Sequence, residues 1–252
     1  MRLDEFDPSD IKVRDHGRGG GGFPGGGGGK MGCGTLVIVL IAALVFGVDP
    51  GQMLGGLEGM QQAGPEAGQQ GAPGDSAQEI CAQNAYAKES CNALSSLNKT
   101  WEPLFAKSNI GFEQPTLNFY QGGTRSGCGA AQSAMGPFYC PADQGIYIDT
   151  SFYDQMAQQL GAKGDFARYY VMAHEYGHHV QKLVGLADQV HSLQSRNPEQ
   201  ANALQVRMEL QADCYAGVWA GRTRALIEPG DMEEGLTAAR ALGDDTLQRN
   251  AG

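Results

Sequence analysis

The pattern of apolar and polar positions predicts a mostly helical domain with a few strands in residues 79–252. Apolar residues recur at helical spacing in residues 79–98, 151–160, 166–186, 198–227 and 231–241, and residues 101–105 extend the first helix. Residues 115–120, 138–141 and 144–149 are predicted strands, the last two joined by a turn. The glycine-rich residues 121–135 are expected to form a loop. The pattern therefore indicates an α+β fold with a small β-sheet.

An uncharged, mostly apolar run occupies residues 31–48, before this domain. Its length is at the short end of what spans a bilayer. A signal peptide would start near residue 1, and a buried core helix would show a polar stripe, so we expect one membrane-spanning helix. Lysine and arginine residues precede the run, and none follows it until Lys88. This asymmetry predicts a cytoplasmic N-terminus and a periplasmic or extracellular domain, anchored in the inner or plasma membrane.

The segments on either side of the apolar run are poor in core-forming residues. Residues 1–30 alternate in charge and then become glycine-rich, so we expect a disordered cytoplasmic tail. The glycines lack the Gly-Lys-Ser/Thr ending of a phosphate loop, so nucleotide binding is not expected. Residues 49–78 are rich in Gly, Gln and Pro and are predicted to be a linker that holds the domain off the membrane.

Charge and cysteine content narrow the class of protein. The net charge is -10, which argues against nucleic-acid binding because that binding rests on basic patches. The six cysteines form no Cys-x-x-Cys pair, so a structural zinc ribbon is not expected. Cys81 with Cys91 and Cys128 with Cys140 have loop-closing spacing, and we expect these disulfides in an oxidising compartment. Cys214, in a predicted helix, is expected to be a buried free thiol.

The densest chemical signal is His174-Glu-Tyr-Gly-His178 in the predicted helix 166–186, for which Asp165 is the expected N-cap. Residues four apart share a helical face, so both imidazoles can reach one metal ion, with Glu175 beside it. Gly177 is a position where a close-packed partner can pass. The same motif also arises by chance on solvated helices.

A catalytic zinc ion has three protein ligands and one open position for water. The candidates for the third ligand are His179, His191, Glu209, Asp213 and Cys214. Glu209 and Asp213 are four apart in the predicted helix 198–227, so one can bind the metal while the other orients a ligand histidine. Glu209 reaches further, and we expect it to be the ligand, with Asp213 as the orienting partner. The alternative for this pair is a solvated face beside Arg207 or Arg222.

These residues predict a hydrolase in which Glu175 takes a proton from the zinc-bound water and delivers it to the leaving amine. The developing oxyanion needs a second electrophile, and the candidates that remain open are Tyr176, His179, His191 and Tyr215. Residues 145–149 are a candidate edge strand to which an extended peptide substrate adds.

Several stretches of the sequence together resemble one family. They are residues 1–6, the glycine-rich stretch, Cys128-Gly with residues 136–143, His174-Glu-Tyr-Gly-His-His-Val-Gln181, Glu209-Leu-Gln-Ala-Asp-Cys-Tyr-Ala-Gly-Val-Trp219 and Leu242-Gly-Asp-Asp245. On these residues the chain resembles the bacterial putative neutral zinc metallopeptidases, a membrane-anchored family similar to the gluzincins. The resemblance implies a zincin-like domain with zinc at His174, His178 and Glu209, and Glu175 as the general base.

The resemblance leaves three interpretations of function. The first is an active zinc metallopeptidase that acts on protein or peptide substrates; retention of Glu175 favours it, because a structural zinc site needs no base there. The second is a membrane-tethered binding or scaffold protein with a vestigial zinc site. It is favoured by the expectation that family members continue past the position of Gly252 into a histidine-containing segment, so that domain 79–252 is truncated. The third is a zinc amidase acting on cell-wall peptides.

Overall fold

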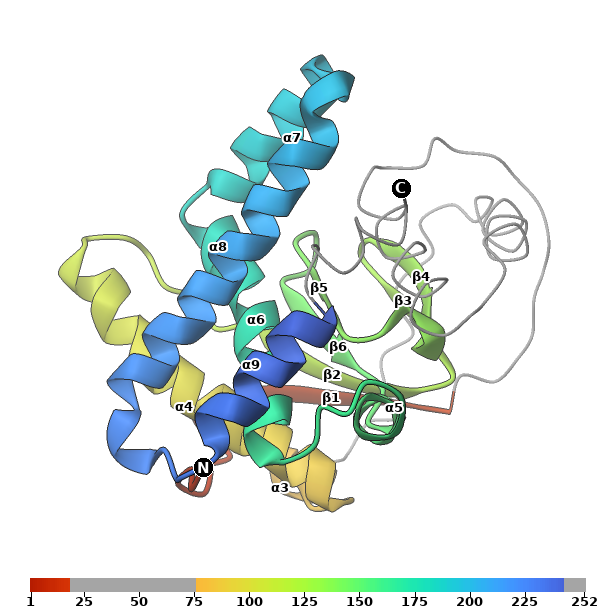
Figure 1. Ribbon diagram of the computed structural model, residues 1–252, viewed down its shortest axis with the longest axis vertical. Coiled ribbons are helices and arrows are strands. Elements are labelled where there is room, and N and C mark those ends of the chain that lie inside the picture. The colour runs from red at the N-terminus through yellow and green to blue at the C-terminus, as the bar shows by residue number, and fades with distance from the viewer. Residues whose placement is uncertain (19–75, 243–252) are drawn as a thin grey trace.

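The computed structural model describes residues 1–18 and 76–242, and Figure 1 shows them as helices gathered beside a small sheet. The sheet has the strand order β1-β2-β6-β5, formed by Lys12–Arg18, Thr116–Gln121, Gly145–Ile148 and Phe138–Cys140. β1, β2 and β6 are parallel, and β5 runs antiparallel to β6. A separate hairpin joins β3 (Gly123–Ser126) to β4 (Gly129–Gln132), inside the segment for which a loop was predicted. The α+β class is confirmed.

Both faces of the sheet are covered, which explains why its inner strands are buried. Leu117 and Phe119 of β2 alternate along the strand and pack into the main core with the helices. Tyr120 of the same strand and Tyr147 of β6 join a second, smaller core with Ala131 of the β3–β4 hairpin. The β2 strand therefore separates two apolar layers.

The central helix is α6 (Asp165–Leu183), which contacts α4 (Ala85–Lys107), α8 (Ala201–Arg222), α9 (Asp231–Leu242) and β5. Its buried residues lie on every side of the helix, as expected for a helix enclosed by partners. The shorter helices α3 (Ala77–Cys81) and α5 (Ser151–Gln159) lie at the periphery, and single 3-10 turns occupy Ser133–Met135, Pro198–Gln200 and Arg224–Leu226. The fold thus holds α6 rigidly against both the sheet and α8.

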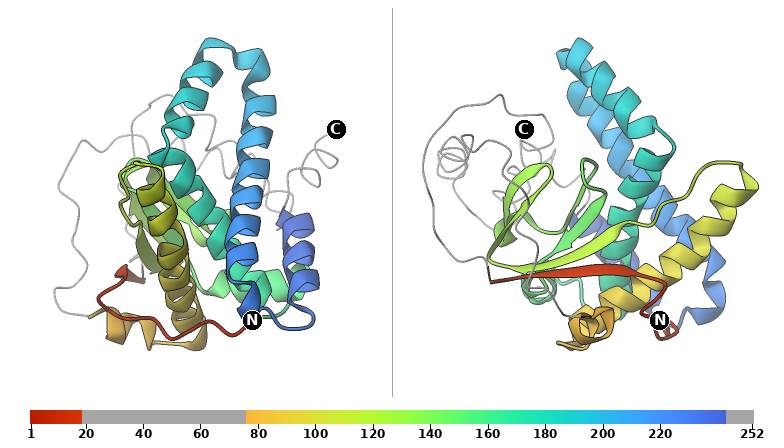
Figure 2. Two further views of the ribbon diagram at one scale, coloured as in Figure 1. Left: turned by 90° about the vertical axis from the view of Figure 1, so that its left-hand side faces the viewer. Right: turned by 180° about the vertical axis from the view of Figure 1, so that it is seen from behind.

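The predicted helix 166–186 ends earlier than expected. Gly185 adopts a left-handed conformation with φ of 76°, which breaks the helix and starts α7 (Leu186–Arg196). Figure 2 shows α7 and the adjoining part of α8 extending as a helical hairpin away from the sheet. The sequence did not reveal α7 because it is mostly polar, with Gln194 as its buried residue.

The prediction of a disordered tail is wrong for residues 1–18. β1 pairs with β2 from Lys12 to Arg18, although Val13 is its single aliphatic residue. The Met1 ammonium group lies 2.9 Å from the Asp231 carboxylate and 3.1 Å from that of Asp165. The Asp165 carboxylate therefore pairs with the N-terminus. The predicted N-cap of α6 was Asp165, but the N-cap in the structure is Gly164.

The apolar run 31–48, the rest of the tail and most of the linker 49–78 lie outside the described residues. Within the described parts of the chain, no helix is both long and apolar enough to cross a bilayer. The pairing of β1 with β2 nevertheless bears on the predicted topology. Paired strands lie in one compartment, whereas the sequence predicts opposite sides of a membrane for residues 12–18 and the domain.

Both cysteine pairs with loop-closing spacing are bonded. Cys81 at the end of α3 is joined to Cys91 of α4, and Cys128, in the turn of the β3–β4 hairpin, is joined to Cys140 of β5. The second bridge fixes the hairpin to the outer strand of the sheet. Cys214 is a free thiol, but it is exposed rather than buried as predicted.

Candidate metal centre

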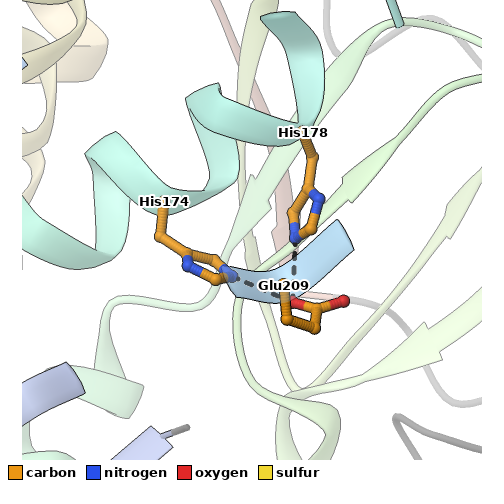
Figure 3. Close-up of side chains that lie close together, drawn as sticks. All are labelled: His174, His178 and Glu209. Carbon is orange, nitrogen blue, oxygen red and sulfur yellow. Dashed lines mark hydrogen bonds and ion pairs between the residues drawn. The ribbon is translucent and has the colours of Figure 1, made fainter. Parts of the chain in front are cut away.

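Three side chains from two helices converge on one point. His174 and His178 lie one turn apart on α6, and their rings point to Glu209 of α8 (Figure 3). One oxygen of Glu209, Oε2, lies 3.2 Å from the Nε2 atom of each histidine. Ligands held at 2.0–2.1 Å around a tetrahedral zinc ion are separated by about 3.3 Å. The two distances to Glu209 therefore suit a zinc ion, and all three ligand atoms lie within 4.8 Å of one another.

The hydrogen-bond partners of the two imidazoles also suit a cation. Each ring has an oxygen acceptor at both nitrogens: His174 faces Asp213 and Glu209, and His178 faces Gln181 and Glu209. A neutral imidazole has one N–H, so it can satisfy only one of its two acceptors. A cation between the two Nε2 atoms and Glu209 removes this conflict. The Nε2 lone pair of each ring and the Glu209 carboxylate then face positive charge, and the single N–H of each ring, at Nδ1, donates to its other acceptor.

The electrostatics of the site without a metal ion point in the same direction. Burial alone would lower the pKa of His174, but hydrogen bonds to Asp213 and Glu209 outweigh it and raise the pKa well above its ordinary value. For His178 burial is likewise outweighed, chiefly by the charge of Glu209, and the pKa is raised. Burial would raise the pKa of Glu209, yet the charge of His178 and the hydrogen bonds to both rings hold it well below its usual range. The site thus attracts positive charge.

A close approach of the two helices brings the three residues together. A Cβ atom at Gly177 would lie 2.9 Å from the Cα and carbonyl oxygen of Ala212 in α8. Real Cβ atoms do not approach backbone so closely, so any larger residue at 177 would force α6 and α8 apart. Gly177 lies between the two histidines, and Ala212 lies one turn after Glu209. The predicted role of Gly177 as a position for close packing is confirmed.

An outer set of residues holds the histidine rings. Asp213 Oδ1 accepts a hydrogen bond from His174 Nδ1 at 2.8 Å, and Tyr170 donates to the same oxygen. Asp213 is thus placed as the sequence predicted for an orienting partner. On the other ring, the side chain of Gln181 contacts His178 Nδ1 at 2.9 Å. Tyr170 and Gln181 were not among the predicted site residues, although they lie four residues before His174 and three residues after His178, which is a usable signal.

Glu175 is a buried residue of α6 and is 8% exposed. Burial raises the pKa of Glu175; the charges of His174 and His178 and a hydrogen bond from the backbone of Tyr139 in β5 oppose the rise without cancelling it. A buried carboxyl group with a raised pKa beside a candidate metal centre has the properties of a general base.

None of the four candidates for the second electrophile faces the three ligands. Tyr176 is buried and donates to Asn98 at 2.8 Å, and the Tyr215 ring packs against Trp101. His191 is exposed on α7. His179 is fully buried and contacts the Tyr139 hydroxyl at 3.0 Å and the Glu113 carbonyl at 2.6 Å, and burial lowers its pKa to about 4. His179 therefore joins α6 to β5 as a neutral group.

Residues 145–149 do not form an edge of the sheet as predicted, because the sheet ends in β1 on one side and in β5 on the other. β6, which those residues form, pairs with β2 on one side and with β5 on the other. β5 pairs only with β6 in the part of the chain that the structure describes. Since Tyr139 of β5 contacts both Glu175 and His179, the free edge of the sheet lies beside the candidate metal centre.

Comparisons with known proteins agree with this geometry. The family described as Putative neutral zinc metallopeptidase matches residues 5–252. The uncharacterized protein YpfJ of Escherichia coli K12 is 48% identical over 239 residues, which cover 92% of this chain and 78% of YpfJ. The uncharacterized protein Rv2575 of Mycobacterium tuberculosis H37Rv is 37% identical over 224 residues, covering 82% of this chain and 72% of Rv2575. No solved structure matches the chain.

Proposed function

Because the chain belongs to the putative neutral zinc metallopeptidase family, we propose that it is a zinc-dependent peptidase that hydrolyses peptide bonds. The observation that carries the proposal is the convergence of His174 Nε2, His178 Nε2 and a Glu209 oxygen beside the buried Glu175. Three protein ligands are typical of a catalytic zinc site, which keeps its fourth position for water, whereas structural sites use four protein ligands.

His174, His178 and Glu209 would hold the ion, which when bound lowers the pKa of a water molecule to about 7 and polarises a carbonyl group. Glu175 then accepts the proton from the attacking water and passes it to the leaving amine. The raised pKa of Glu175 suits this exchange, because a carboxylate that binds a proton more readily is a better base for the attacking water and can return the proton to the amine. Asp213 and Tyr170 keep the His174 ring directed at the ion.

The free edge of strand β5 is evidence that the substrate is a peptide. An extended peptide can add to a free sheet edge through main-chain hydrogen bonds. Such a peptide on β5 would run past Tyr139, whose backbone bonds to Glu175, and so bring a scissile bond close to the base. The disulfide of Cys140 to Cys128 and the contact of Tyr139 with His179 hold this strand in place.

Removal of the metal tests the proposal. The full chain is expected to cleave an unstructured protein such as casein, to lose this cleavage after treatment with a chelator, and to regain it when one equivalent of zinc is added. Cleavage that a chelator leaves unchanged would contradict the proposal. Zinc binding without cleavage of any protein or peptide substrate would instead support a binding protein with a vestigial zinc site.

Membrane attachment through residues 31–48 is a part of the proposal that rests on the sequence. The two disulfides support a domain outside the cytoplasm. The β1–β2 pairing supports residues 1–18 in the same compartment, so we propose an attachment in which residues 31–48 do not carry the chain across the bilayer. In sealed vesicles that carry a Cys33→Ser chain, an impermeant maleimide is expected to label the exposed Cys214 and a cysteine introduced at Asp4 to the same extent. Labelling of only one of them would contradict the common compartment.

A further inference from the structure

The side chain of Gln181 connects the two helices of the metal centre. It lies on α6 three residues after His178 and is fully buried. Its oxygen Oε1 lies 2.9 Å from His178 Nδ1. Its nitrogen Nε2 lies 2.7 Å from the backbone carbonyl oxygen of Met208 and 3.1 Å from Oε1 of Gln211, both in α8. Every polar atom of this amide is therefore engaged.

The Met208 contact decides which way round the amide lies. A backbone carbonyl oxygen can only accept a hydrogen bond, so the NH₂ end of the amide must face it. The amide oxygen then faces His178, and Nδ1 of that ring must carry the proton. This leaves Nε2 of His178 with a lone pair directed at Glu209 and the candidate metal position. The backbone of α8 thus selects the tautomer of a histidine on α6.

The same amide also fixes a distance. Met208 immediately precedes Glu209, so Gln181 joins the His178 ring to the turn of α8 that carries the third ligand. Gly177, one turn before Gln181 in α6, and Ala212, one turn after Met208 in α8, set the approach of the two helices. Gln181 therefore controls how far His178 lies from Glu209.

The two histidines differ in the charge of their outer partners. His174 faces the carboxylate of Asp213, whereas His178 faces the neutral amide of Gln181. With Glu209 and Asp213 ionised, a divalent cation brings the charge of this set to zero. A second outer carboxylate at position 181 would make the loaded site negative, which would strengthen its hold on the cation.

We propose that Gln181 is a positioning residue of the metal centre, which fixes the His178 tautomer and its spacing from Glu209. This inference rests on the proposed zinc site. It concerns a residue that makes no contact with the ion itself and acts through His178. Substitution of Gln181 is therefore expected to lower the affinity for zinc, whereas substitution of a buried glutamine with a purely structural role would not.

The test compares three variants of the full chain by their zinc dissociation constants, measured in competition with a chromogenic chelator. Gln181→Met keeps the length of the side chain but removes the acceptor, and we expect zinc to bind about 10–100-fold more weakly. Gln181→Glu retains an oxygen acceptor for Nδ1 but loses the NH₂ donor to the Met208 carbonyl, and we expect its affinity to lie between that of Gln181→Met and that of the wild type.

The matched control is Gln194→Met. Gln194 is also a buried glutamine, and it joins α7 to α8 through the Ala201 carbonyl and Gln205 without contacting either histidine. This variant is expected to lose thermal stability but to bind zinc as the wild type does. The visible spectrum of the Co²⁺-loaded protein should change in Gln181→Met and stay unchanged in Gln194→Met.

The outcomes separate this inference from the proposed function. If the wild type binds zinc and Gln181→Met binds it equally well, the role of Gln181 is overturned while the zinc site stands. Equal weakening in Gln181→Met and Gln181→Glu would overturn it too, because the acceptor would then be irrelevant. If the wild type binds no zinc, the metal centre itself is overturned, and this inference with it.

Discussion

Replacing Glu209 by glutamine is expected to weaken zinc binding by more than about a hundredfold, beyond the 10–100-fold typical of an outer partner. The amide has the size of the carboxylate but no charge, and the carboxylate is the group that faces both imidazoles. The carboxylate is also ionised at neutral pH, since its pKa is held well below its usual range. Metal content after dialysis and chelator competition would measure the loss.

Two further substitutions make this experiment specific. Asp213→Asn should weaken zinc binding by about 10–100-fold, because it removes the charge behind His174 but none of the ligands. Glu199→Gln, at an exposed acid just before α8, should leave zinc binding unchanged. A loss of zinc only in the Asp213 variant would exchange the roles assigned to the two acids.

Replacing Glu175 by glutamine is expected to lower kcat/KM for peptide cleavage by about 10²–10⁴-fold while zinc content stays that of the wild type. An amide cannot take up the proton of the attacking water, and Glu175 is the buried acid beside the ligands. The loss corresponds to roughly 3–5 kcal/mol of transition-state stabilisation. Steady-state kinetics on one peptide, with metal analysis of the same samples, would measure both quantities.

The pH dependence provides an independent check on Glu175. Its raised pKa places the acid limb of the kcat/KM profile above the ordinary value for glutamate, since the base must be ionised to accept a proton. Activity should therefore fall as the pH drops through that raised pKa. If the residual activity of Glu175→Gln falls at the same acidic pH as that of the wild type, the acid limb belongs to another group. If Glu175→Gln cleaves the peptide at the wild-type rate, the mechanism is refuted.

Local helical spacing made the inner part of the site predictable. His174 with His178, and Glu209 with Asp213, are pairs four residues apart, so each pair shares a helical face whatever the tertiary fold. That the two faces meet could not be read from spacing; it depends on Gly177 packing against Ala212. Outer partners depend on contacts between helices, and the role of Gln181 requires the Met208 carbonyl of α8.

Elements defined by tertiary contacts were the ones that sequence reasoning missed or misplaced. β1 has one aliphatic residue among seven, so its strand conformation comes from pairing with β2 rather than from an apolar pattern. Residues 145–149 look like an edge strand because they alternate, but the antiparallel β5 covers that edge. His179 looks like a catalytic candidate because of its neighbours, yet both its nitrogens bond away from the ligands.

The position of β1 in the sheet determines when the first strand of the chain can begin to pair. Its partner β2 begins about a hundred residues later in the chain, so a ribosome working at 5–20 residues per second needs about 5 to 20 seconds to produce it. Until then the first strand made has nothing to pair with. A nascent chain without β1 would also leave β2 as an open edge beside β6, a template for association with other chains. Removal of residues 1–18 is thus expected to reduce the solubility of the protein more than the catalytic activity of the molecules that stay in solution.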